Sequence, residues 1–148
     1  MITEDYVSFE TAKLLKEKGF RHWCYKSYGT AVYHKGEPIS FDEEHDLLDA
    51  GLGDEIEYVE GGYLYDFGCD NRKEDAKVWA APTLWVAMKW LREVYGLFIR
   101  ITEDVTGKVF GWSVYQKNYG CRVSTLNVED SYEEACEAAI KYCLENLI

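Results

Sequence analysis

Three histidines and five cysteines are the residues of this 148-residue sequence best suited to metal binding or covalent chemistry. His22 and Cys24 are two apart in a β-prone stretch, so their side chains are predicted to point to one side of a strand. A turn at Tyr28-Gly29 would place His34 opposite Trp23, on the other side. The sequence has none of the ligand spacings typical of zinc sites. It therefore predicts no metal site and no cofactor.

Catalysis has little support in the sequence. There is no G-x-S-x-G nucleophile elbow, and no histidine stands in a recognisable arrangement with a serine or cysteine. Cys24 with His22 or His45 is the pair that an enzyme would use. The carboxylates at 42–46 are abundant, but general acid chemistry requires an environment that raises a carboxyl pKa. A non-enzymatic protein is favoured, and a cryptic enzyme is kept as an alternative.

The negative charge of the chain is concentrated in residues 42–75. This segment holds 13 carboxylates against Arg72 and Lys73, a balance of −11 that equals the net charge of the whole chain. Such acidity repels nucleic acid and anionic lipid and favours a basic protein partner. Within the segment Asp66, Asp70 and Glu74 recur every four residues, but the glycine and glutamate of a calcium-binding EF-hand loop are missing. The alternative is a solvated acidic face that aids solubility.

Aromatic residues gather beside this charge. Tyr63, Tyr65 and Phe67 alternate, so one face of a strand could present three rings, which with surrounding carboxylates suit a basic peptide or a cationic ligand. The predicted interaction residues are Glu55, Glu57, Tyr58, Glu60, Tyr63, Tyr65, Asp66, Phe67 and Trp79. Two alternatives remain open: the rings belong to the core, or they stack the base of a nucleotide-like small molecule. For the latter, only Arg72, Lys73 and Lys77 could supply basic contacts.

The cysteines and the termini indicate the compartment. An odd number of cysteines without a C-x-x-C pair is typical of reduced, cytoplasmic proteins. The N-terminus is acidic and lacks the basic start and apolar core of a signal peptide, and no apolar run approaches the roughly 20 residues that cross a bilayer. We therefore expect a cytoplasmic protein that does not span a membrane; its oligomeric state is not predicted.

The first half of the chain is predicted to combine helices with short strands. Ser8 caps a helix over Phe9–Lys18 that ends at Gly19, and Asp42 caps a short acidic helix that runs to Leu48. Glycine-containing turns are expected between pairs of strands. The expected strands are Phe20–Lys26 and Thr30–His34, joined at Tyr28-Gly29; Pro38–Phe41, after a turn at Lys35-Gly36; and Ile56–Val59 and Tyr63–Phe67, separated by Gly61-Gly62. The polar stretch Cys69–Asp75 is predicted to be a mobile loop.

The second half begins with a helix and a hairpin. From Thr83 to Tyr95 two apolar stripes follow helical spacing, the second containing Trp85, Val86, Trp90 and Val94, so this helix is predicted to pack on two sides. A turn at Asp104–Gly107 would segregate the side chains of the following hairpin by face. The expected pairs are Leu97 with Val114, Ile99 with Trp112 and Ile101 with Phe110. Arg122–Leu126 supplies a third strand, and a capping box of Ser131 and Glu134 opens the last helix.

These elements predict an α+β fold in a single domain, 1–148, with an N-terminal α/β-hairpin half (1–76) and a C-terminal half (77–148). The order of the C-terminal half, helix, three antiparallel strands and helix, resembles the double-stranded-RNA-binding domain. That domain grips RNA with basic residues at the start of its second helix. Here the stretch Ser131–Glu137 is acidic, so the likeness implies the shape without RNA binding.

Three helical segments, SFETAKLLKEKGF (8–20), APTLWVAMKWLREVYGLFI (81–99) and SYEEACEAAIKYCLENL (131–147), resemble small uncharacterised proteins from prophages and mobile elements of gut Bacteroidetes. The likeness covers about a third of the chain. It implies a phage-related setting, in which small acidic proteins often act by binding other proteins. The leading hypothesis is therefore a non-enzymatic accessory protein that binds a basic partner through residues 42–79.

Overall fold

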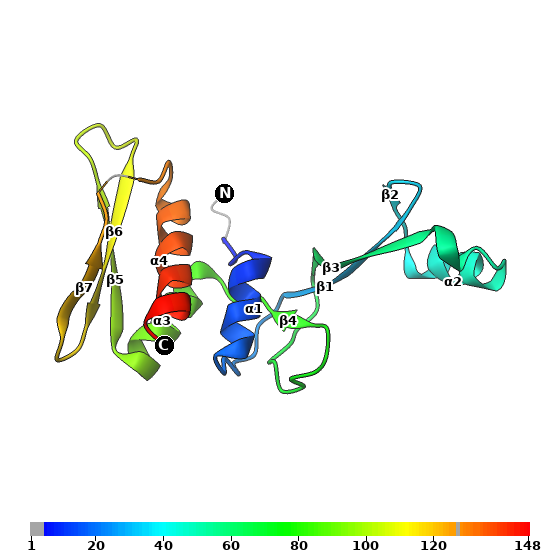
Figure 1. Ribbon diagram of the computed structural model, residues 1–148, viewed down its shortest axis with the longest axis horizontal. Coiled ribbons are helices and arrows are strands. Elements are labelled where there is room, and N and C mark those ends of the chain that lie inside the picture. The colour runs from blue at the N-terminus through cyan, green and yellow to red at the C-terminus, as the bar shows by residue number, and fades with distance from the viewer. Residues whose placement is uncertain (1–4, 127) are drawn as a thin grey trace.

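The structure, a computed structural model that describes residues 5–126 and 128–148, confirms the α+β class. Figure 1 shows helices and sheets in successive layers along an elongated molecule. The helices are α1 (Phe9–Glu17), α2 (Phe41–Asp49), α3 (Leu84–Tyr95) and α4 (Tyr132–Asn146), with a 3-10 turn η1 at Gly53–Glu55. The strands are β1 (Ser27–His34), β2 (Glu37–Pro38), β3 (Ile56–Tyr65), β4 (Trp79–Ala80), β5 (Leu97–Glu103), β6 (Phe110–Gln116) and β7 (Gly120–Ser124).

Side chains that cap helices set the start of each helix. Ser8, Thr83 and Ser131 each accept a hydrogen bond from the backbone N–H three residues ahead, the arrangement predicted for Ser8 and Ser131. In α2 the cap is Ser40, which accepts from the N–H of Glu43, and not the predicted Asp42. Both residues are good caps, so composition alone does not choose between them.

One sheet, of order β2-β1-β3 with β4 paired to β1, is built mainly from the first half, and the C-terminal half forms a three-stranded sheet with strand order β5-β6-β7. Helices α3 and α4 pack on this sheet, and α1 lies against α4 (Figure 1). The largest cluster of buried residues draws on both halves of the chain: Leu15 and Phe20 share it with Leu91, Leu97 and Ile140. The hydrophobic core therefore runs from α1 through the layer of α3 and α4 to the sheet.

The register of the β5–β6 hairpin differs from the prediction by two residues. Ile99 pairs with Val114 and Ile101 with Trp112, because the four-residue turn lies one position later than expected, enclosed by Asp104 and Val109. A shift of two leaves every side chain on its predicted face. The predicted apolar face does pack on the core, and only its pairing was wrong. The alternation of side chains could exclude a shift of one, but not a shift of two.

The predicted turn at Tyr28-Gly29 is wrong, because both residues lie inside the single strand β1. There Tyr28 pairs with Leu64 of β3 and with Trp79 of β4. The ring of Tyr65 lies over Gly29, so closely that a Cβ on Gly29 would stand 2.9 Å from a ring carbon. This glycine makes room for an aromatic ring and does not form a turn.

The second predicted turn, at Gly61-Gly62, is an irregularity within the continuous strand β3. The pairing with β1 shifts between Val59–Ala31 and Tyr63–Gly29, so that residues 60–62 lie opposite Thr30 alone. Gly61 adopts φ +68° at this point, a conformation that glycine reaches without strain. The irregularity therefore bends one long strand and does not separate two short ones.

The second apolar stripe of α3 is only partly covered in the part of the chain that the structure describes, because Trp90 is buried and its ring meets Phe20 edge to face at 5.4 Å. Leu84, Ala87 and Leu91 are buried as predicted. Trp85 and Val94, however, are 66% and 56% exposed. The second side of α3 is therefore covered at Trp90, whereas Trp85, Val86 and Val94 leave an exposed apolar strip along the helix.

Candidate functional site

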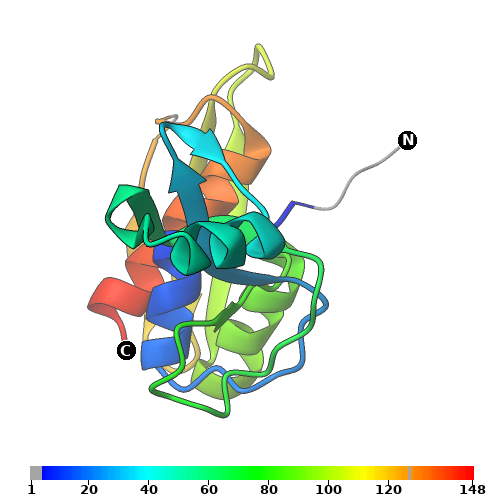
Figure 2. The same ribbon diagram turned by 90° about the vertical axis from the view of Figure 1, so that its right-hand side faces the viewer.

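The acidic segment forms most of an arm that projects from the body. We use "arm" for residues 27–67, which contain β1, β2, α2 and β3. In Figure 1 the ribbon of β1 and β3 leads away from α1 and carries α2 and β2 at its far end, and Figure 2 views the molecule from that end. None of the residues of α2, all of which are described, is buried. The helix thus contributes side chains to the surface and almost nothing to the core.

Aromatic rings cluster on the arm where the sequence predicted them. The centroids of Tyr63 and Tyr65 are 4.7 Å apart, and those of Tyr65 and Phe67 are 5.1 Å apart. Phe41, the first residue of α2, adds a fourth ring by stacking on Tyr65 at 6.3 Å and 15°. Tyr63 is 57% exposed, and Phe41 and Phe67 are exposed as well. Sequence reasoning missed Phe41, whose only signal was its position directly after a capping serine.

The predicted carboxylates have different surroundings. Glu57 is exposed and forms no ion pair within the described chain, so its charge faces solvent. Glu55 contacts His34 at 3.1 Å. Glu60 lies 3.8 Å from both Lys13 and Lys77, at the base of the arm. Reversing the charge of Glu60 would disturb the junction with the body, whereas Glu57 can be changed without breaking an ion pair.

Two tyrosines of the predicted set are tied down by their hydroxyl groups. Tyr58 donates a hydrogen bond to Oε1 of Glu44 on α2 at 2.7 Å, and Tyr65 donates to the carbonyl oxygen of Thr30 at 2.7 Å. The bond to Glu44 raises the pKa of Tyr58, and burial raises that of Tyr65. Both hydrogen bonds hold the tyrosine rings in place before any partner binds. Binding therefore costs less side-chain entropy than it would with freely rotating rings.

Trp79 does not belong to this surface. It is only 7% exposed in β4, where its ring meets Phe9 edge to face at 5.0 Å. The ammonium group of Lys16 lies 5.5 Å from the ring centroid and donates to the carbonyl oxygens of Ala76 and Val78. Trp79 is therefore a core residue, since its ring is buried although β4 pairs only with β1. Its assignment as an interaction residue was wrong.

The three evenly spaced carboxylates do not converge. Asp66 pairs with Lys26 at 3.0 Å, Asp70 with Arg72 at 2.8 Å, and Glu74 with Arg21 at 2.5 Å. Among the described residues, no group of three or more His, Cys, Asp or Glu side chains is placed to hold a metal ion. Asp66 and Glu74 instead tie the 66–75 segment to Lys26 and Arg21 of the body, whereas Asp70 pairs within the segment.

The residues that an enzyme would need are also separate. His45 lies on α2 and contacts Asp49 at 3.4 Å, whereas Cys24 is buried beside Cys69, to which it is joined by two backbone hydrogen bonds of 2.9 and 3.0 Å. His22 is exposed. Burial raises the pKa of the Cys24 thiol to about 12, which holds it as a neutral thiol near pH 7. A nucleophilic cysteine requires the opposite shift.

Because three cysteine thiols are buried, we expect the folded protein to lose stability in alkaline solution. Burial raises the pKa of Cys24 and Cys143 to about 12 and that of Cys136 to about 11. Above the ordinary thiol pKa, near 9, the unfolded chain releases these protons and the folded chain keeps them. The free energy of unfolding should therefore fall from pH 9 towards pH 11, by up to about 1.4 kcal/mol per pH unit for each thiol.

Urea unfolding of the wild type and of Cys143→Ala at pH 7.5, 9 and 10.5 measures this effect. The variant loses stability at every pH because a small cavity forms, but its stability should depend less on pH than that of the wild type. Parallel pH curves for the two proteins would contradict the prediction.

Comparison with protein-family models, curated proteins and solved structures found no match to this chain. The structure therefore establishes the fold class, α+β, and no family. In residues 5–126 and 128–148, no helix is long and apolar enough to cross a membrane.

Proposed function

We propose that this chain is a non-enzymatic protein that binds a basic protein partner through the exposed rings and carboxylates of the arm. The observation that carries the proposal is the arm itself: α2 contributes nothing to the core, yet it projects from the body with four clustered rings beside it. A small domain gains little stability from such an element, so its surface is the feature that a partner can use. A phage-related setting is part of the proposal and rests on the resemblance of the three helical segments, and a cytoplasmic location is part of it on the strength of the cysteine pattern.

The chemistry of the arm favours a partner rich in Lys and Arg. Exposed aromatic rings bind cationic side chains through cation–π contacts, and they bury a large area at low cost in entropy. The carboxylates of α2 and of Glu57 add a negative field that steers a basic surface towards the arm. The first turn of α2 alone contains Asp42, Glu43 and Glu44.

The same observations weigh against the two alternatives. A nucleotide needs basic contacts, yet Arg72 and Lys77 are engaged with Asp70 and Glu60, which leaves Lys73 of the three predicted basic residues. The enzyme alternative pairs Cys24 with His22 or His45, but His45 lies on the projecting helix α2 and burial raises the pKa of the Cys24 thiol to about 12. Neither alternative is favoured by a specific feature of the arm.

Charge reversal on the arm tests the proposal. We expect Asp46→Lys with Glu57→Lys to reduce capture of the partner from native cells at least about tenfold, because both charges face solvent and attraction becomes repulsion. Tyr63→Ala should also reduce capture. Binding by the wild type should weaken as salt rises, because screening shortens the Debye length to about 3 Å at 1 M.

Matched controls separate the arm from net charge. Glu103→Lys with Glu145→Lys changes the charge equally on exposed residues of β5 and of the end of α4, and Tyr119→Ala removes an exposed ring from the turn before β7. These variants should retain capture. If arm variants with an unchanged unfolding temperature still retain the same partner, the proposal is wrong.

A further inference from the structure

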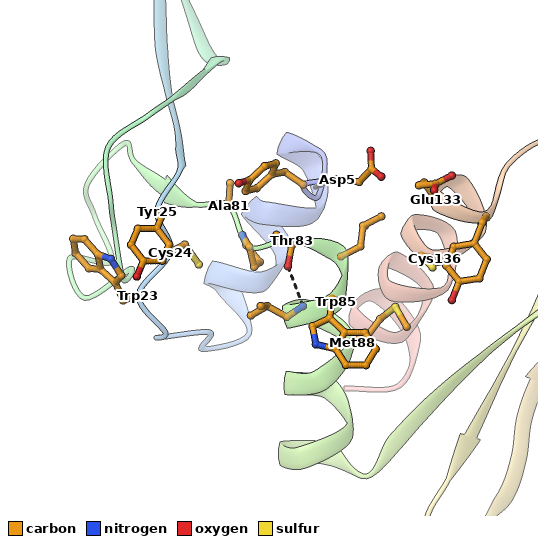
Figure 3. A pocket seen from close by; sticks show the side chains of 15 residues that line it. Asp5, Trp23, Cys24, Tyr25, Ala81, Thr83, Trp85, Met88, Glu133 and Cys136 are labelled. Carbon is orange, nitrogen blue, oxygen red and sulfur yellow. Dashed lines mark hydrogen bonds between the residues drawn. The ribbon is translucent and has the colours of Figure 1, made fainter. Parts of the chain in front are cut away.

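A groove of about 530 Å³ opens on the body between residues 23–25 and the N-terminal ends of α3 and α4 (Figure 3). Its walls are mostly apolar, and they include part of the second stripe of α3 that was predicted to be buried. The side chains that matter most are Trp23, Tyr25, Trp85, Met88 and Tyr132. All of these except Met88 are more than half exposed. This volume is typical of sites that bind small ligands or the side chains of a peptide.

An acidic hollow continues this groove. Asp5, Tyr6, Leu84 and Glu133 line both depressions, so the two share a wall. The hollow adds three carboxylates, those of Glu129, Glu134 and Glu137. No lysine, arginine or histidine is among the described residues that line either depression. The acidic stretch Ser131–Glu137 supplies three of the carboxylates that line the two depressions, and the fold brings Asp5 and Glu129 beside them.

One carboxylate of the hollow has an oxygen with unused bonding capacity. Oε1 of Glu137 accepts hydrogen bonds from the backbone N–H and the hydroxyl of Ser8 and from the hydroxyl of Thr11. Its other oxygen, Oε2, is buried and has no hydrogen-bond partner within the described structure. A buried carboxylate oxygen without a donor is costly. Glu137 also adds its negative charge to the lining of the hollow, and this charge would attract a Lys or Arg side chain placed there.

We propose that the groove and the acidic hollow together bind a short basic segment of a partner protein, with an aromatic or aliphatic side chain against Trp85 and a Lys or Arg side chain in the hollow. The apolar walls set the first requirement and the carboxylates set the second. The continuity of the two depressions fits an extended segment better than a single compact ligand. This site is distinct from the arm and does not depend on the function proposed for it.

A pair of synthetic peptides tests the site on the full-length protein. The basic probe is the capped peptide Leu-Trp-Lys-Arg-Lys, and the matched probe is Leu-Trp-Glu-Asp-Glu. NMR titration of the ¹⁵N-labelled chain should show the largest shifts at Tyr25, Trp85 and Glu133 with the basic probe. The acidic probe should bind at least about tenfold more weakly, because its Glu and Asp side chains would be repelled by the carboxylates of the hollow.

Substitutions then locate the binding. Asp5→Lys with Glu133→Lys should weaken the basic probe at least about tenfold, and Trp85→Ala should weaken it by a similar factor. All three residues are exposed, so the fold should survive, which thermal unfolding checks. Glu103→Lys with Glu145→Lys, and Tyr119→Ala, are the matched controls and should bind as the wild type does.

The outcomes separate this site from the arm. Shifts that concentrate on Tyr63, Phe67 and α2 would overturn the groove and support the arm. Equal affinity of the groove variants and their controls would overturn the groove as well. So would the absence of any shift with millimolar basic probe. Conversely, loss of binding in the groove variants with intact capture by the arm would support both sites independently.

Discussion

Replacing Asn71 with alanine is expected to lower the free energy of unfolding by about 3–5 kcal/mol. The amide of Asn71 donates to the carbonyl oxygen of Phe20 at 3.1 Å and accepts from the N–H of Ala80 at 2.8 Å. The residue is buried and holds a left-handed backbone with φ +64°. Alanine leaves two buried backbone groups unsatisfied and tolerates this backbone less well than asparagine does.

Two further substitutions divide this effect into its parts. Asn118→Ala removes another asparagine with positive φ (+72°), but from an exposed turn, so it should cost only about 1 kcal/mol. Asn71→Asp keeps the acceptor and the backbone preference, but places a carboxylate oxygen against the carbonyl of Phe20, and should cost about 2–4 kcal/mol. Urea unfolding measures all three. Equal losses for Asn71→Ala and Asn118→Ala would show that the two hydrogen bonds contribute nothing.

Asn71 matters for function because of what it joins. It connects the end of the segment that follows α1, through Phe20, to β4, and it lies in the stretch Cys69–Asp75 that the sequence indicated as a mobile loop. This stretch leads from the arm back to the body. The buried amide of Asn71 therefore anchors the junction of the arm, in addition to the ion pairs of Glu60, Asp66 and Glu74.

Gly61→Ala is expected to cost about 2–5 kcal/mol, the second large effect. The backbone of Gly61 has φ +68°, and a Cβ there would stand 2.3 Å from a carbon of the Phe9 ring. That ring cannot move away cheaply, because it is packed against Trp79 at 5.0 Å and Tyr28 at 5.8 Å. Alanine must therefore displace part of the core or straighten the bend of β3, and either change alters the direction of the arm.

Two other glycines serve as controls for this substitution. Gly36→Ala imposes the same left-handed strain (φ +79°) with no atom within 4 Å, so it should cost about 1 kcal/mol. Gly68→Ala would meet the ring of Trp23 at 2.0 Å, but that side chain is 61% exposed and can rotate into solvent. Thermal unfolding should therefore rank Gly61→Ala well above both. A loss for Gly61→Ala no larger than that for Gly36→Ala would contradict the role assigned to Phe9.

Much of the fold follows from local patterns. The helices at Phe9, Leu84 and Tyr132 start where a serine or threonine can cap them, and their buried faces repeat at helical spacing. The apolar face of β5 and β6 follows from alternation along each strand. Such patterns involve residues only a few positions apart, so they can be recognised without knowing which distant segments come into contact.

The errors have a common physical cause. Glycines at 29 and 61 look like turn residues, but their role depends on the rings of Tyr65 and Phe9, which are 36 and 52 positions away. Trp79 lies beside the acidic segment in sequence, yet it is drawn into the core by β4. The pairing of β5 with β6 could shift by two residues without exposing an apolar side chain, so only the turn decided it.

The candidate sites divide in the same way. Composition alone located the acidic aromatic arm, because its charge and rings are consecutive in the sequence. The groove and its hollow draw residues from positions 5, 23–25, 84–88 and 129–138, so that no local window contains them. The sequence determined which residues can carry charge and rings, whereas contacts between distant segments decided which of those side chains face one another and which remain open to a partner.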